Sequence, residues 1–386
     1  MSHIYLDNNA TTPIHPQVAE AIKPFLNELF GNPSSIHFAG RDVKAPYDAA
    51  RDSIAAMIGA KVDEVVITSC GSEANNHAIK GIACVRRNDK GHIITSTVEH
   101  PAVLNACRYL ETRGFSVTYI PVDGFGLVDP EDVKDAIRND TILVSIMYAN
   151  NETGTVMPIR DIAQIAHERG IPVHSDMVQA LGKIKVDMTD LGVDLASFSG
   201  HKVYAPKGIG ALYVREGTVL DSLIHGGHQE AGRRAGTENV IGIVAFGKAC
   251  ELAGIHADEY TARLERLRRR LLDGILETID HVRLNGHPTQ RIPNTLNLSF
   301  EFVESESLLF SLDRKGIAVS SGSACSSGSD EPSHVLLAMG IPGPVCQSAL
   351  RFSLGWETSE DDIDYVLEVL PGIVGRLREM SPLYRK

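Results

Sequence analysis

The chain has 386 residues, of which 43% are apolar and 22% charged, and its formal net charge is −12 at pH 7. This composition is ordinary for a globular protein with room for two domains, and the acidic balance argues against a nucleic-acid surface, which needs a basic patch. No stretch approaches the roughly 20 apolar residues of a membrane span, and the N-terminus lacks the pattern of a signal peptide, so we expect no membrane partner.

The six cysteines show no C-x-x-C spacing, which favours reduced thiols, a cytoplasmic location and no metal site. Three of them, Cys84, Cys107 and Cys250, fall in apolar helical patterns and are predicted to be packing residues. Cys325 differs, because it lies in SGSACSSG, a run of small residues typical of a loop. An exposed thiol in such a segment is a candidate reactive cysteine.

In the first two thirds of the chain, apolar strands alternate with amphipathic helical patterns. The predicted strands are Glu64–Ser69, His92–Thr97, Ser116–Pro121, Ile142–Tyr148, Ile171–Ser175, Leu195–Ser199 and Gly210–Val214. Helical patterns such as Ala102–Thr112 and Ile159–Glu168 lie between several of them. This alternation predicts an α/β fold whose seven-stranded, mostly parallel sheet is covered on both faces. Ligands of such sheets bind at the carboxyl ends of the strands.

The last third of the chain has a different pattern, which predicts a smaller α+β domain. A long helical stretch over Asn239–Ile279 has an expected break near Gly254. The short strands Val282–Asn285, Asn294–Ser299 and Ala349–Ser353 follow, with a final helix over Glu360–Arg378. We expect a large cofactor-binding domain of residues 15–255. Residues 1–14 and 256–386 are expected to form the small domain, with Cys325 on a loop at 320–331.

Two strand exits carry residues that suit a reactive site. Asp176 follows the strand Ile171–Ser175 directly, and Gln179 comes three residues later. The strand Leu195–Ser199 runs into Gly-His-Lys, which places Lys202 at a second exit. A desolvated lysine is a common Schiff-base nucleophile. Taken singly, the aspartate also fits a turn residue and the lysine a surface loop residue.

A third strand exit has the features of a phosphate-binding site. The strand Glu64–Ser69 is followed by Cys70-Gly71-Ser72-Glu73 and then by a helix. Small residues there leave backbone N–H groups free, and the helix dipole favours an anion. Neither G-x-x-x-x-G-K-[ST] nor G-x-G-x-x-G is present, which argues against a nucleotide fold. An ordinary capped helix fits this segment equally well when it is considered alone.

Considered together, the three strand exits meet the needs of pyridoxal 5'-phosphate (PLP). This cofactor requires a phosphate site, a carboxylate that keeps its pyridine nitrogen protonated, and a lysine that holds its aldehyde. Asp176 and Lys202 supply the last two, 26 residues apart. The sequence therefore predicts a PLP enzyme.

The motifs of the chain resemble the cysteine desulfurases, PLP enzymes of aminotransferase fold type I (class V). The resemblance is strongest to the nitrogen-fixation NifS type, with the IscS type close by. It covers nearly the whole chain through YLDNNATTP, FGNPSSIH, TSCGSEANN, VEHPAVL, ANNETGT, HSDMVQALGK, SGHKVYAPKGIGALY, GGHQEAGRRAGTEN, PNTLNLSF, SSGSACSSG and RFSLG. One departure is Met177, where the family mostly has alanine; Val178 should lie under the cofactor ring with Met177 packed behind it.

The resemblance implies a role for each matching residue. Lys202 would form the Schiff base, His100 would stack on the ring as an acid–base group, and Cys325 would attack the substrate sulfur. Asp176 would pair with the ring nitrogen and Gln179 with the ring hydroxyl. The phosphate would be held by Gly71, Ser72, Ser199 and His201, and by Thr237 from a partner subunit. The substrate would be held by Asn32, Asn151 and Arg351, with Asn151 also near the cofactor.

The implied function is removal of sulfur from L-cysteine, which gives L-alanine and a persulfide on Cys325. The resemblance also implies a homodimer and an iron–sulfur scaffold protein of the NifU kind as sulfur acceptor, in nitrogenase-type cluster assembly. Selenocysteine lyase, or another PLP enzyme of this fold, is the main alternative. A second alternative is a scaffold protein for iron–sulfur assembly that has lost its chemistry. The presence of Lys202, Asp176 and His100 argues against it.

Overall fold

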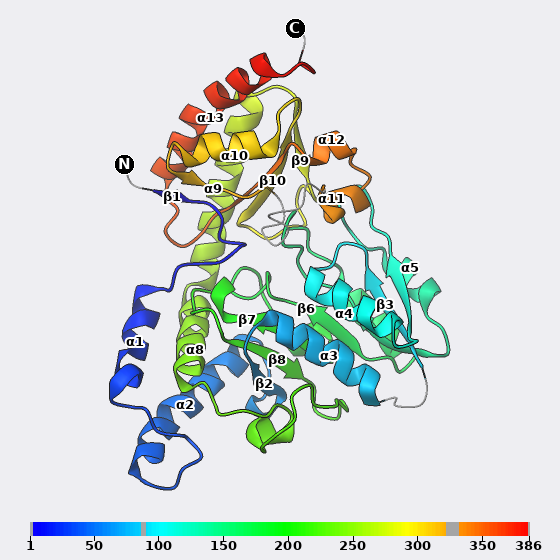
Figure 1. Cartoon of the computed structure of the whole chain (residues 1–386), viewed down its shortest axis with the longest axis vertical. Coiled ribbons are helices and arrows are strands. Elements are labelled where there is room, and N and C mark those ends of the chain that lie inside the picture. The colour runs from blue at the N-terminus through cyan, green and yellow to red at the C-terminus, as the bar shows by residue number, and fades with distance from the viewer. Residues whose placement is uncertain (1–2, 86–89, 322–331, 385–386) are drawn as a thin grey trace.

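The computed structural model describes residues 3–85, 90–321 and 332–384, and its centre is a seven-stranded sheet (Figure 1). The order of the strands is β2-β8-β7-β6-β5-β3-β4. They are β2 (Val65–Thr68), β3 (His92–Ser96), β4 (Ser116–Ile120), β5 (Thr141–Ser145), β6 (Val173–Asp176), β7 (Leu195–Ser199) and β8 (Gly210–Val214). Only β8 runs antiparallel to its neighbours, β2 and β7. The mostly parallel sheet of seven strands is therefore confirmed.

Most strand boundaries lie within one residue of the prediction, but two differ by more because backbone N–H groups bond elsewhere. The β5 strand ends at Ser145 rather than Tyr148, and the Met147 N–H donates to Oε1 of Glu99 at 2.9 Å instead of to a strand. The β6 strand begins at Val173 rather than Ile171, since the Ile171 N–H bonds to a helix carbonyl and Pro172 has no N–H. Neither contact can be deduced from hydrophobic periodicity.

Helices cover both faces of the central sheet, and the burial of alternate strand residues explains why. Val65 and Ile67 pack in one core cluster, whereas Val66 between them packs in another on the opposite face. The first cluster takes in α1 (Pro16–Asn27), α2 (Phe38–Met57), α5 (Pro130–Ala136), α6 (Ile159–His167), α7 (Met188–Leu191) and α8 (Val240–Ile255). The second is covered by α3 (Gly71–Val85) and α4 (Pro101–Glu111).

The C-terminal part of the chain builds a separate core around a three-stranded antiparallel sheet, at the top of Figure 1. The sheet has the order β12-β10-β9, with β9 (Val282–Asn285), β10 (Thr295–Phe300) and β12 (Ala349–Ser353). The helices of this core are α9 (Ala257–Thr278), α10 (Ser305–Asp313) and α13 (Glu360–Met380). The short helices α11 (His334–Ala338) and α12 (Gly343–Cys346) instead bury residues in the first cluster. The N-terminal β1 (Ile4–Tyr5) joins this part by pairing with β11 (Ile317–Ala318).

The predicted helix break lies at His256, where α8 and α9 meet at an angle of 75°. The division into domains at residue 255 remains a prediction. Three short 3₁₀ turns complete the described structure: η1 (Val62–Glu64), η2 (Gly200–Lys202) and η3 (Gln229–Gly232). Within the described residues, no single helix is long and apolar enough to cross a bilayer. In the same residues, the bent pair of α8 and α9 reaches that length and composition only when the two helices are taken together.

Candidate active site

A pocket of about 220 Å³ lies at the carboxyl ends of β6 and β7, where parallel sheets place their ligands. It brings together most of the predicted site residues: Gly71, Ser72, His100, Asn151, Asp176, Gln179, Ser199, His201, Lys202 and Arg351. Asn32 and Thr237 do not line it. Cys325 and its loop lie outside the described residues, so the predictions for that loop remain predictions.

The Asp176 carboxylate is held in place by two hydrogen bonds. Asn75 Nδ2 donates to Oδ2 at 2.6 Å, and the Val178 N–H donates to Oδ1 at 3.0 Å. Asp176 is the last residue of β6 and is buried. These two contacts fix the position of the carboxylate oxygens. A fixed carboxylate at this point suits the protonated ring nitrogen of PLP.

The N-terminus of α3 forms a cradle that fits a phosphate. The helix begins at Gly71, and a Cβ there would come within 2.7 Å of Val178 Cγ2. The Ser199 hydroxyl, at the end of β7, is buried and has no hydrogen-bond partner in the structure. A phosphate oxygen would supply the missing partner, and the helix N-terminus would favour its charge. The residues present therefore fit PLP at both its phosphate and its ring nitrogen.

Lys202 is held by a part of the chain that the sequence reasoning did not include. Its Nζ donates to the backbone carbonyls of Asn9 at 2.5 Å and Ala10 at 2.6 Å. The buried Asn9 side chain also donates to the Asn151 carbonyl at 3.1 Å and to Thr295 Oγ1 at 2.8 Å. Asn9 thus ties the reactive lysine to both parts of the chain. The motif YLDNNATTP contains it, but no local pattern showed this contact.

His100 is the N-cap of α4, which decides which ring nitrogen carries the proton. Its Nδ1 accepts the Ala102 N–H at 3.1 Å, so the neutral ring must bear its hydrogen on Nε2. Burial lowers the pKa of His100, the charge of Asp176 opposes this, and Lys202 adds to the lowering. Protonation of Nδ1 would also break the cap. His100 is therefore a neutral hydrogen-bond donor through Nε2.

His201 is also kept neutral. Burial, followed by the charges of Lys202 and Lys207, lowers its pKa to about 4. Its Nδ1 lies 3.1 Å from the Thr11 hydroxyl, again in the N-terminal segment. A neutral imidazole can donate one hydrogen bond to a phosphate without adding a second positive charge beside Lys202.

Arg351, on β12, has the geometry of a carboxylate-binding residue. Its two terminal nitrogens donate to the Asn151 carbonyl at 3.0 Å and to Asp7 Oδ1 at 2.8 Å. Its Nε is buried and has no hydrogen-bond partner in the part of the chain that the structure describes. Only 1% of the residue is exposed, so the missing acceptor is not bulk water. The carboxylate of an amino-acid substrate would satisfy this donor, while Asp7 fixes the orientation of the guanidinium.

Glu99 is a second buried carboxyl beside the site, and the sequence reasoning gave it no role. Its Oε1 accepts from Ser96 Oγ at 2.6 Å and from the Met147 N–H, while Oε2 has no partner among the described residues. Burial, reinforced by the charge of Asp176, raises its pKa to about 8 despite these donors. Glu99 is therefore an uncharged acid at neutral pH. Its position before His100 in VEHPAVL was the only signal available.

The packing predictions are confirmed in all but one case. Met177 is fully buried in the core, whereas Val178 lines the pocket, as expected for alternate residues of an extended segment. Cys107 and Cys250 are buried as predicted. The prediction for Cys84 was wrong: it is exposed near the end of α3, where Ile82 and Ala83 face the core and Cys84 and Val85 do not.

The chain is similar to known proteins over almost its full length. The family model Aminotransferase class-V matches residues 4–366. A protein named cysteine desulfurase IscS from Methanosarcina thermophila is 52% identical over 99% of this chain and 95% of its own length. One with the same name from Dictyoglomus turgidum is 52% identical over 98% of this chain and 96% of its own.

Solved structures show the same similarity. A NifS-like protein superposes with a TM-score of 0.91 at 38% identity, covering 97% of this chain and 100% of its own. A structure titled SspA in complex with cysteine gives a TM-score of 0.81 at 38% identity, covering 91% of this chain and 98% of its own.

Proposed function

Since the chain belongs to the class-V aminotransferase family and is a PLP-dependent enzyme of the cysteine desulfurase class, we propose that it converts L-cysteine to L-alanine and a persulfide on Cys325. The observation that carries the proposal is the pocket itself. It combines Lys202, the fixed Asp176 carboxylate and the α3 cradle with the partnerless Nε of Arg351. A structural neighbour whose title names a complex with cysteine supports the substrate.

Each group of the pocket has a defined task in this proposal. Bound PLP withdraws electrons from the α-carbon of an amino acid. Arg351 binds the substrate carboxylate through Nε, and the hydrogen bond to Asp7 keeps the Arg351 guanidinium in position. Lys202 Nζ, once released from the cofactor, takes the α-proton. His100 donates a hydrogen bond from Nε2 to the substrate sulfur, because its Nδ1 is engaged in the helix cap.

Cys325 performs the sulfur transfer in this proposal. Its thiolate attacks the substrate sulfur, a new S–S bond forms, and the C–S bond breaks with its electron pair left on the β-carbon. That carbon then takes a proton, which leads to alanine. A free thiol has a pKa of about 8.5, so the reaction requires a group that removes the proton. We assign this task to the substrate thiolate, stabilised by the donor His100.

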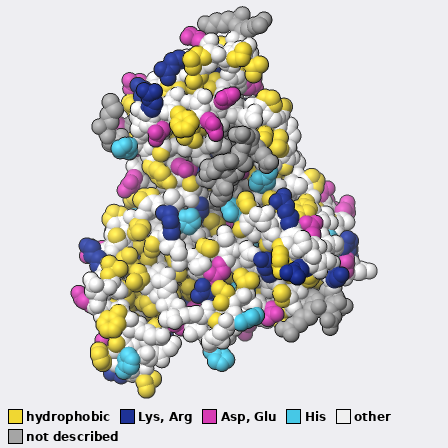
Figure 2. Space-filling view, viewed as in Figure 1, with side chains coloured by type: hydrophobic (Ala, Val, Ile, Leu, Met, Phe, Trp, Pro, Cys, Tyr) yellow, Lys and Arg dark blue, Asp and Glu magenta, His cyan; other side chains and the backbone are white. Residues whose placement is uncertain are grey.

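We further propose a homodimer in which each pocket is completed by the partner subunit. Asn32 and Thr237 are exposed and do not line the pocket of their own chain. Their segments lie together, since Ser34 Oγ is 3.5 Å from Glu238 Oε1. The same region exposes large apolar side chains, namely Leu26, Phe30, Ile36 and Phe38, of which Ile36 is 91% exposed. Hydrophobic side chains over α1 and the start of α2 are visible at the lower left of Figure 2.

The sulfur acceptor is proposed to be an iron–sulfur scaffold protein. This part rests on the motif resemblance and on relatives named IscS, and the nitrogen-fixation assignment rests on the NifS-like motifs alone. A nitrogen-fixation role and a housekeeping role in cluster assembly differ in the scaffold protein that receives the sulfur. Cluster assembly on a NifU-type scaffold and on a housekeeping scaffold, compared at equal concentrations, would separate them.

The test of the sulfur-transfer step is the variant Cys325→Ala. It should bind PLP normally but lose sulfide release from L-cysteine by at least about 100-fold, because no other group is assigned to take the sulfur. Sulfide and alanine are measured with a reductant present. The matched control is Cys84→Ala, which removes an exposed thiol from α3 and should leave both products unchanged.

Full turnover by Cys325→Ala would refute the assignment. A native enzyme active on selenocysteine but inactive on cysteine would instead favour the lyase alternative. Persulfide labelling of the native protein after one turnover identifies the residue that carries sulfur.

A further inference from the structure

A buried lysine that none of the assigned roles explains lies directly behind the pocket. Lys183 follows Gln179 by four residues, in the turns after β6, and only 5% of it is exposed. Its Nζ donates to Gln179 Oε1 at 2.6 Å and lies 3.4 Å from Asn9 Oδ1. Both partners belong to the candidate active site, since Asn9 and Gln179 line the pocket.

The surroundings of Lys183 do not stabilise a positive charge on its amine. Of the described residues, no carboxylate forms an ion pair with it, and the charged groups that act on its amine are the cations Lys202 and Arg351. The positive charge of Lys183 also contributes to the lowered pKa of His201. Burial, followed by repulsion from Lys202 and Arg351, lowers the pKa of Lys183 well below its usual value. Burial of an amine without a counter-ion costs free energy, which calls for a functional explanation.

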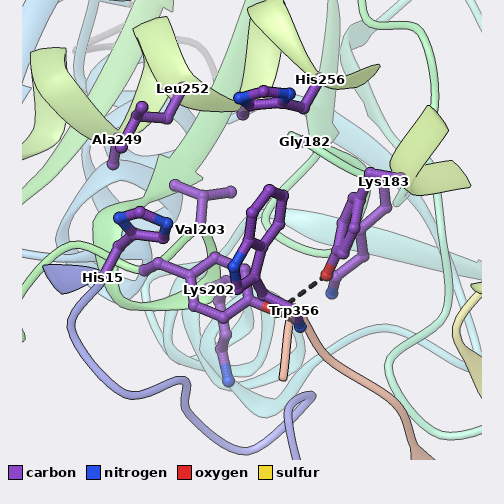
Figure 3. Close-up of a pocket in the computed structure, with 12 residues that line it drawn as sticks. His15, Gly182, Lys183, Lys202, Val203, Ala249, Leu252, His256 and Trp356 are labelled. Carbon is purple, nitrogen blue, oxygen red and sulfur yellow. Dashed lines mark hydrogen bonds between the residues drawn. The ribbon is translucent and has the colours of Figure 1, made fainter. Parts of the chain in front are cut away.

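The other side of Lys183 faces a cavity of about 40 Å³ whose lining is mostly apolar, with Ala249, Leu252 and Trp356 among its residues (Figure 3). Its titratable lining residues, besides Lys183 itself, are Lys202, His15, His256, Tyr204 and Tyr260. The α9 residue Thr261 binds the Lys183 backbone carbonyl through its hydroxyl at 3.2 Å, which holds this segment in place. The polar partners of the Lys183 amine are therefore confined to the side that faces the active site.

The hydrogen bond from Lys183 decides how the Gln179 amide is oriented. Because an amine donor occupies Oε1, the amide nitrogen must point the other way. Nε2 donates to the Asn9 carbonyl at 3.0 Å, and the same carbonyl accepts the reactive amine of Lys202 at 2.5 Å. The N–H group of Gln179 and the Lys202 amine thus meet at one carbonyl oxygen. Without Lys183, Oε1 would lose its donor, and the contact of Nε2 with the Asn9 carbonyl would be left to hold the amide in this orientation.

We propose that Lys183 is a positioning residue that makes Gln179 a hydrogen-bond donor toward the PLP ring oxygen and thereby favours the deprotonated form of the Lys202–PLP linkage. A donor to the ring oxygen stabilises its negative charge, and this leaves the linkage nitrogen with a weaker hold on its own proton. A positive charge on Lys183 would likewise favour the deprotonated form of the linkage. The inference rests on the proposed roles of Lys202 and Gln179.

The experiment is a pH titration of the visible absorption band of the resting holoenzyme without cysteine. Lys183→Met removes the amine but keeps the length of the side chain, and an apolar residue in place of a buried charge usually preserves folding. The midpoint of the titration should rise by about 1 pH unit. The control is Lys185→Met, which changes an exposed lysine two residues away and should leave the midpoint unchanged.

A double-mutant cycle separates positioning from a general structural effect. Gln179→Leu should raise the midpoint by itself, and adding Lys183→Met to it should change the midpoint by less than half as much as in the native background. A midpoint for Lys183→Met equal to that of Lys185→Met, or fully additive shifts, would overturn the inference. A native protein without a band that depends on Lys202 would instead contradict the proposed function.

Discussion

At the scale of single residues, the site depends on groups whose charge is set by their surroundings. Glu99 and Lys183 are both buried beside residues of the pocket, and burial shifts each pKa toward the uncharged form. The neutral state of His100 and His201 has the same cause. Asp176 is held in position by two hydrogen-bond donors. The pocket therefore holds few net charges besides those of its assigned binding groups.

The raised pKa of Glu99 predicts a dependence of stability on pH. The folded state keeps a proton up to about pH 8, whereas the unfolded chain loses it near the usual carboxyl pKa of 4.5. The folded state thus binds the extra proton between these values, so the free energy of unfolding should fall as pH rises, by up to about 1.4 kcal/mol per pH unit. Glu99→Gln should remove this loss.

Urea unfolding of native protein and Glu99→Gln at pH 5 and pH 8 measures the difference. The variant should lose less stability between the two pH values than the native protein. Glu277→Gln, at an exposed position on α9, is the control and should behave like the native protein. Equal losses in native protein and Glu99→Gln would show that Glu99 is ionised in the folded state.

At the scale of elements, the junction between β2 and α3 shows how local structure builds a binding site. The strand ends at Thr68, the helix begins at Gly71, and the backbone of the first turn borders the pocket. The approach of Val178 to Gly71 leaves no room for a side chain. The absence of a Cβ at this position is therefore a packing requirement and a condition for a bound phosphate.

Gly71→Ala should weaken PLP binding. The added Cβ would lie 2.7 Å from Val178 Cγ2, so Val178 must shift toward the place of the cofactor ring. Overpacking of this kind costs about 1–3 kcal/mol, which corresponds to a rise in the PLP dissociation constant of about tenfold or more. Gly343→Ala is the control, since Gly343 also begins a helix, α12, but a Cβ there meets nothing within 4 Å.

The dissociation constant is measured by adding PLP to the apoprotein and following absorbance or fluorescence. Unchanged affinity in Gly71→Ala would show that the α3 N-terminus does not hold the phosphate.

At the scale of the whole molecule, the active site lies where two cores meet. The central sheet supplies Asp176 and Lys202, β12 of the C-terminal sheet supplies Arg351, and the N-terminal segment supplies Asn9 between them. The proposed dimer adds Asn32 and Thr237 from a second copy. A change on the exposed apolar surface of α1 and α2 should therefore affect the pocket of the partner.

Ile36→Asp should weaken the dimer by about tenfold or more, because it places a charge on an apolar surface proposed to be buried between subunits. Ile36 is 91% exposed in the single chain, so the folding of the subunit should be unaffected. Sedimentation velocity over a range of concentrations measures the shift toward monomer. Phe310→Asp, at a 65% exposed position on α10, is the control. A variant that dimerises like the native protein would place the interface elsewhere.

Local patterns in the sequence predicted the seven strands of the central sheet, the helix break near residue 255, and Asp176, Lys202 and the Gly71 cradle. These features follow from local signals: apolar periodicity for the strands, and small or reactive residues at their carboxyl ends for the site. The identities of Lys202, Asp176 and Gly71 could be read in this way because each lies at the carboxyl end of a strand or within three residues of it. The resemblance to cysteine desulfurases supplied the other predicted residues of the pocket.

Only the tertiary structure decided which residues support these groups. Asn9, Asp7, Glu99 and Lys183 contact the site through hydrogen bonds across long sequence separations or through burial, and neither leaves a periodic signal in the chain. The protonated nitrogen of His100 and the orientation of Gln179 likewise depend on a single neighbouring donor. Sequence patterns record the chemistry that a side chain offers, whereas its charge and orientation are set by the partners that folding brings to it.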